Sequence, residues 1–235
     1  MSCHQPVMRG QPLSAGCNRN CFQEASSFSR QGFFKLSRFT LLFILAVIVT
    51  KTSHADRKEL LYDVFQGSDK IGMLKAVRVN DGLQSNYHIE TRISYRILLP
   101  IEVLVVVGNS FNNEKMTNAF AKREVNGSVK TNNTIFWNQS IYYMITKDKD
   151  TSTWNKPISN CVSALYFKEP MNIEQVFSEN YLQNLPIVKT DPGIYQVTLP
   201  DGRTNYYKYR NGVCTDVELE IMWNSIHLKL TTSSG

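Results

Sequence analysis

The sequence is poor in histidine, cysteine, glycine and proline, and each shortage excludes a class of protein. Its 235 residues include four His, five Cys, 12 Gly and eight Pro. Five Cys are too few for a miniprotein that disulfides hold together. The low Gly and Pro content excludes collagen, and 42% hydrophobic residues exclude a wholly disordered chain. The chain is therefore expected to fold around a core of its own.

The short motifs of the common enzyme classes are also missing. No Gly-x-Ser-x-Gly, His-Glu-x-x-His, Gly-x-Gly-x-x-Gly, Ser-x-x-Lys or phosphate-binding loop occurs in the chain. After residue 55 the histidines are His88 and His227, which we expect to be solvated. Cys161 or Cys214 could form a nucleophilic pair with one of them, although their spacing does not indicate it. We predict no catalytic residue, no enzymatic activity and no cofactor.

Metal-binding patterns are weak as well. Four residues near the N-terminus have a spacing that matches no zinc site: Cys3, His4, Cys17 and Cys21. Three acidic residues project from one face of a predicted strand: Asp216, Glu218 and Glu220. They could bind calcium, but a solvated face on which they pair with neighbouring basic side chains is the simpler interpretation. We predict no metal site.

Long hydrophobic runs are absent. The longest is residues 41–49, which would rise about 13 Å as a helix, less than half of a hydrocarbon core of about 30 Å. Basic residues precede this run, and Ser53 and Ala55 place small side chains at the −3 and −1 positions of a cleavage site. The pattern is typical of a secretory signal peptide rather than of a stable transmembrane span, with an uncleaved anchor as the alternative.

We therefore predict a leader at residues 1–55, with the signal peptide at 33–55. Residues 1–32 form a long, polar segment without hydrophobic periodicity, which we interpret as an over-extended reading frame upstream of the true start. The mature chain would begin at Asp56 and be exported to the periplasm or cell envelope. It holds 20 basic and 19 acidic residues, so the net positive charge of the whole chain belongs to the leader. Without a basic stripe, no nucleic-acid partner is expected.

The pattern of the mature chain is that of antiparallel β-structure. The clearest alternation runs from Tyr87 to Ile97, with apolar and polar residues on opposite faces. Four dipeptides mark tight turns: Asp81-Gly82, Asn126-Gly127, Asp201-Gly202 and Asn211-Gly212. We expect type I′ geometry at the last two. The predicted fold is mainly β, a single domain at residues 56–235 in which about ten strands form an up-and-down antiparallel, strongly curved sheet or barrel.

Residues 155–186 interrupt this pattern. Three prolines punctuate them, and the alternation stops. We expect a short helical or loop insertion, with two helical turns at Ser159–Phe167 and a short helix or ordered loop at Ile173–Leu182. The insertion would lie across the opening of the sheet or over its concave face. Cys161 lies within it, and Cys214 lies in a later strand; the two could form a disulfide or remain buried free thiols.

One strand, Ile101–Phe111, is apolar on both faces between Val103 and Val107, so both faces must be covered. The insertion offers apolar side chains for this cover. If they fill the space, the interior is a dry core; if they only roof it, a lipid-sized pocket remains. We predict the roofed pocket, with these lining residues: Val103, Val105, Val107, Tyr166, Phe167 and Phe177.

Four stretches resemble an uncharacterised family of exported proteins that is common in Bacteroidota and carries a domain-of-unknown-function label. They are YDVFQGSDKIG at 62–72, VSALYFKEP at 162–170, VFSE at 176–179 and LPDGRTNYYKYRNGVCTDVEL at 199–219. The resemblance covers nearly all of the mature chain and implies no activity, cofactor or catalytic residue. The expected architecture is also similar to the curled β-sheets of periplasmic lipoprotein carriers, which is an analogy of fold.

Together these features predict an exported, non-enzymatic cell-envelope β-protein. It would bind a lipid or another apolar or amphipathic ligand, or an envelope protein partner. A structural or assembly factor that uses its sheet edges is one alternative. An envelope hydrolase, whose carboxylates or Cys–His pair meet only in the fold, is another.

Overall fold

The computed structural model describes residues 55–96, 99–221 and 224–235, which belong to one compact unit at residues 52–235. Apart from Ala55, the predicted leader and its signal peptide lie outside the described residues. Within the described ranges, no helix is both long and apolar enough to cross a lipid bilayer.

In the described part of the chain, fourteen strands form a single antiparallel sheet. In chain order they are β1 (Asp56–Gln66), β2 (Asp69–Asp81), β3 (Gln84–Arg96), β4 (Pro100–Asn112), β5 (Lys115–Val125), β6 (Ser128–Trp137), β7 (Tyr142–Ile145), β8 (Thr151–Trp154), β9 (Gln175–Ser178), β10 (Gln183–Asp191), β11 (Ile194–Thr198), β12 (Thr204–Arg210), β13 (Val213–Ile221) and β14 (Asn224–Ser234). The predicted up-and-down antiparallel fold is confirmed, with fourteen strands instead of about ten.

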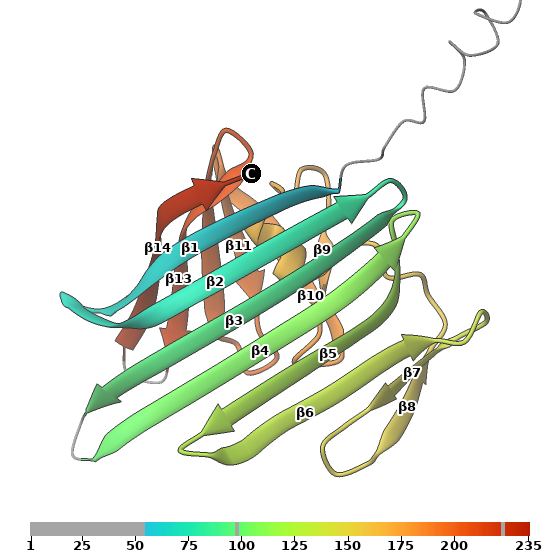
Figure 1. The fold of residues 1–235 in the computed structure, drawn as a ribbon, viewed down its shortest axis with the longest axis horizontal. Coiled ribbons are helices and arrows are strands. Elements are labelled where there is room, and N and C mark those ends of the chain that lie inside the picture. The colour runs from blue at the N-terminus through green and yellow to red at the C-terminus, as the bar shows by residue number, and fades with distance from the viewer. Residues whose placement is uncertain (1–54, 97–98, 222–223) are drawn as a thin grey trace, which may run out of the picture. The chain divides into compact units, whose positions relative to one another are not determined.

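The sheet is curved and does not close into a barrel. Its order runs β8 to β1 and then β14 to β9, so β1 pairs with β14 in the middle and β8 and β9 form the two edges. In Figure 1, strands β2 to β6 run side by side across the front, and strands of the second half lie behind them. The chain leaves one edge at β8 and returns at the other edge at β9. The connecting segment passes between the two halves of the curved sheet, where its side chains contact both.

That connecting segment fills much of the concave side. It carries the short 3₁₀-helix η1 (Val162–Tyr166). One core cluster joins Leu165, Tyr166 and Phe167 to strands β1–β3 and β10–β14, and a second joins Cys161 and Phe177 to β4–β7. Because the segment packs against both halves, its contacts stabilise their arrangement.

The insertion is less helical than the sequence indicates. Ile173–Leu182 is neither a helix nor a loop throughout, because β9 lies within it and pairs antiparallel with β10. The Phe177 N–H donates to the Asn160 carbonyl at 3.0 Å, which ties β9 to the start of the segment. Of the two helical turns expected at Ser159–Phe167, the structure keeps only η1.

The turns follow their residue chemistry. Asn126 and Gly127 have φ of 50° and 73°, and Asn211 and Gly212 have φ of 52° and 75°, the all-positive pattern of type I′ hairpins. The type I′ prediction is wrong at Asp201-Gly202, where only Gly202 has a positive φ, of 86°. There the Asp201 carboxylate accepts the Arg203 N–H at 3.2 Å and so shapes the turn itself.

Candidate ligand cavity and the polar cluster beside it

An apolar cavity of about 280 Å³ lies inside the curved sheet. Strands β1–β4 contribute one wall, with Ile89, Val105 and Val107 among its side chains. Strands β10–β14 contribute the facing wall, which includes Leu185 and Leu219. The alternation along each strand explains the lining, since apolar residues at every second position point to the same concave side.

The helix η1 closes one side of this cavity with Val162, Ser163 and Tyr166. Tyr166 makes edge-on ring contacts with Tyr62 and Tyr207, at centroid distances of 5.5 and 6.3 Å. The Tyr209 hydroxyl donates to the Leu165 carbonyl at 2.7 Å. These contacts hold the helix against both walls, so the cavity has a fixed side.

Three of the six predicted lining residues meet at this cavity: Val105, Val107 and Tyr166. Val103 lies instead at a separate surface depression, beside Ile93 and Leu104. Phe167 packs against the Tyr87 ring at a centroid distance of 5.7 Å. Phe177 packs against Trp154 at 6.1 Å, in the second core cluster. The connecting segment thus fills part of the interior and leaves part of it open.

A buried polar cluster adjoins the cavity through Ser163. Its central group is Glu179, whose side chain accepts hydrogen bonds from the Ser163 hydroxyl and, at 2.8 Å, from Asn109 Nδ2. The residue is only 2% exposed. Burial raises the pKa of the Glu179 carboxyl above its ordinary value, despite these hydrogen bonds. The Glu179 carboxyl therefore stays protonated to a higher pH than the carboxyl of a solvated glutamate.

The two asparagines of this region lie at inward, buried positions of β4 and β6. Asn109 follows Val105 and Val107 on the same face of β4, and Asn133 precedes Ile135 on β6. Asn133 Nδ2 donates to the carbonyls of Glu179 and Asn180, at 3.1 and 2.8 Å. A polar residue at an inward position needs a buried partner. The inward position of these asparagines was the feature of the sequence from which the cluster could have been predicted.

Cys161 lies beside this cluster without a histidine partner among its described contacts. Its sulfur is 3.3 Å from the Ser163 hydroxyl and 3.5 Å from Asn109 Nδ2. Burial raises the pKa of the Cys161 thiol, which disfavours the thiolate that a nucleophile needs. His88 is exposed, and the His227 ring lies 2.8 Å from the Ser225 hydroxyl.

The two described cysteines are free thiols. Cys161 and Cys214 are both buried, and they belong to different core clusters. Of the two possibilities that the sequence left open, the structure has buried thiols.

The acidic row on β13 lies outside the cavity. Val217 is buried and Leu219 lines the cavity, so the alternate residues Asp216, Glu218 and Glu220 lie on the other face of β13, where Glu218 and Glu220 border a separate, open pocket. Asp216 stands opposite Lys208 and Lys229 on the neighbouring strands. In the part of the chain that the structure describes, no group of three or more His, Cys, Asp or Glu side chains could hold a metal ion.

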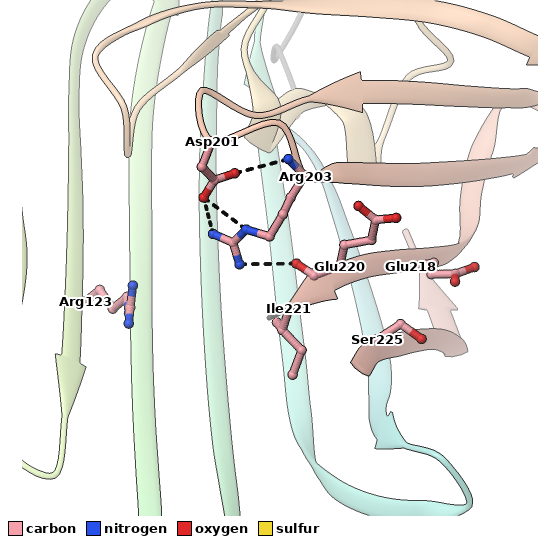
Figure 2. A pocket seen from close by; sticks show the side chains of 7 residues that line it. All are labelled: Arg123, Asp201, Arg203, Glu218, Glu220, Ile221 and Ser225. Atoms are coloured by element: carbon pink, nitrogen blue, oxygen red, sulfur yellow. Dashed lines mark hydrogen bonds and ion pairs between the residues drawn. The ribbon is translucent and has the colours of Figure 1, made fainter. Parts of the chain in front are cut away.

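A wider, open pocket of about 1070 Å³ lies next to the cavity. Figure 2 shows Asp201 and Arg203 on one side of it, closed into an ion pair with a shortest separation of 2.5 Å. Arg123, from β5, stands on the opposite side of the same pocket (Figure 2). Arg123 also lines the apolar cavity, so the two spaces meet at this side chain.

Comparison with known proteins gives a family and a structural neighbour. A family model described as "Domain of unknown function (DUF6134)" matches residues 62–231. Among solved structures, the chain is similar to a beta-barrel-like protein of the DUF1849 domain of unknown function from Brucella abortus. The identity is 10%, the TM-score is 0.48, and the match covers 76% of this chain and 97% of the other. No curated protein matches the sequence.

Proposed function

We propose that this chain, which belongs to the DUF6134 family, is a non-enzymatic binding protein that holds an apolar or amphipathic ligand inside its curved sheet. The observation that supports the proposal is the cavity between the two walls of the sheet. Its volume of about 280 Å³ is close to the lower end of ligand sites. A slender group such as one acyl chain suits this space.

The energetics of such a site come from apolar contact. Each methylene that leaves water for an apolar environment stabilises a complex by about 0.8 kcal/mol. The walls that would receive it are the β4 valines on one side and Leu185 and Leu219 on the other. These walls need no rearrangement to form, because the Tyr209 and Tyr166 contacts already fix the helix between them.

Export to the periplasm or cell envelope is part of the proposal. It rests on the sequence of the leader, with its basic flank, its short apolar run and the small residues that end at Ala55. A binding protein for an apolar ligand is useful in such a compartment, since its ligand would otherwise stay in a membrane.

We expect that filling the cavity weakens ligand binding. Val105→Trp places a large ring in the space, and the dissociation constant for a fluorescent fatty acid should rise about tenfold or more, since overfilling costs about 1–3 kcal/mol. Val106→Trp is the matched control, because residue 106 is on the same strand and points to the opposite face.

Fluorescence titration of the three proteins, with circular dichroism to check folding, measures both effects. Equal binding by the two tryptophan variants would contradict a ligand in this cavity. Absence of binding by the folded wild-type protein would remove the carrier role and leave a structural or assembly role.

A further inference from the structure

We infer that the ligand carries an acidic head group, which Arg123 binds where the apolar cavity meets the open pocket. This inference rests on the proposed function and specifies its substrate class. The acyl part would lie along Val105 and Val107, and the head would face the outer space that Arg123 also lines.

Arg123 differs from every other described residue around the cavity. It is the only charged side chain among those that line it. None of the ion pairs found in the described part of the chain involves it. A guanidinium presents several donors in one plane, a geometry that suits the two oxygens of a carboxylate or a phosphate.

The register of the sheet explains why Arg123 has no ion-pair partner among the described residues. Its neighbours across the strands are Val105 on β4 and Thr131 on β6, neither of which is charged. The adjacent Glu124 projects to the other face of β5, where it forms an ion pair with Lys122 at 2.8 Å. The nearest carboxylate in sequence is therefore on the wrong side of the sheet.

The acidic residues across the open pocket are turned away from Arg123 or are already engaged. Asp201 is paired with Arg203. Glu220 accepts the backbone N–H of Thr204 at 2.7 Å. In Figure 2 the carboxylates of Glu218 and Glu220 point away from Arg123. The exposed guanidinium of Arg123 thus borders the apolar space with no ion-pair partner among the described residues, which favours an anionic head over a neutral or cationic one.

The test compares ligands that share one chain and differ in the head: dodecanoic acid, dodecyl phosphate, dodecanol and dodecylamine. Calorimetric titration of the mature protein should give tighter binding for the two anions than for the alcohol, and weakest binding for the amine. Arg123→Gln should weaken binding of the anions about tenfold or more and leave the alcohol unchanged. Lys122→Gln is the matched control, since this lysine is next in sequence and faces away, and it should change nothing.

The relative affinities of the carboxylate and the phosphate identify which acidic head is preferred. If wild-type protein binds acid and alcohol equally, or if Arg123→Gln weakens both to the same extent, the inference is overturned while the proposed function stands. If none of the four compounds binds to folded wild-type protein, the proposed function fails as well, and the inference fails with it.

Discussion

At the scale of single residues, the most unusual group is a glutamate buried among uncharged partners. Glu179 is fixed by Ser163 and Asn109, and the described contacts of its carboxyl include no cation. Moving an ionised carboxylate into such surroundings is costly, so its pKa is raised. A rise in pH through the folded-state pKa therefore lowers the contribution of Glu179 to stability, whereas it would raise the contribution of a salt-bridged carboxylate.

This group predicts a measurable pH dependence. The ordinary pKa is 4.5 and the folded-state pKa is higher, so the native protein binds more protons than the unfolded chain between these two values. The contribution of Glu179 to the free energy of unfolding is then full at acidic pH and declines as pH rises through that window. Glu179→Gln, which mimics the protonated acid, should remove this decline and be at least as stable as wild type at pH 7.

Urea denaturation at a series of pH values between 4 and 8 measures the difference. Glu179→Ala is the contrasting variant, because it leaves Ser163 and Asn109 without their partner and should cost about 1–3 kcal/mol. A pH profile for Glu179→Gln that runs parallel to that of wild type would show that the carboxyl titrates normally.

The site illustrates what sequence could and could not predict at this scale. Val105 and Val107 were predicted because an apolar run on both faces of a strand must be covered. Arg123 was not singled out, since it stands in a run of charged residues, Lys122 to Glu124, that is typical of a solvated face. Only the register, which places Arg123 opposite Val105, reveals that it belongs to the cavity.

At the scale of elements, the alternation of β3 was enough to predict it, whereas β10, which begins in the non-alternating segment, was missed. Ile89 on β3 is buried and His88 beside it is exposed, as the alternation requires. Strand β10 escaped notice because Pro186 stands within it. The proline is tolerated because its pairing with β11 begins only at the next residue, Ile187.

Pairing between β2 and β3 depends on one glycine. A Cβ at Gly72 would lie 2.1 Å from the carbonyl oxygen of Arg92, a backbone atom that a side-chain rotation cannot move. Gly72→Ala should therefore force the two strands apart and lower the free energy of unfolding by about 2 kcal/mol or more.

Met73→Ala is the control for this substitution. Met73 follows on the same strand and is 55% exposed, so its replacement should change stability by less than about 0.5 kcal/mol. Chemical denaturation of both variants compares them directly, and equal stability would mean that β2 and β3 are not packed as closely as described.

At the scale of the whole molecule, the curved sheet forms the walls of the interior, and the segment between β8 and β9 occupies part of the space between them. The pairing of β1 with β14 joins the two halves of the sheet, and the segment between β8 and β9 is packed between those halves. The sequence predicted the curved sheet and the covering segment. It could not predict how much space would remain, because that depends on the fit of Tyr166 and Phe167 against facing strands.

The central claim is that this remaining space holds a ligand in an exported protein. Native mass spectrometry of the protein, purified without detergent from the exported fraction of its own cells, tests it most directly. We expect a polypeptide that begins at Asp56, accompanied by a non-covalent adduct that lipid extraction identifies as an acidic amphiphile. A polypeptide that retains residues 41–49 would contradict the export step, and a folded protein free of any adduct would contradict the ligand.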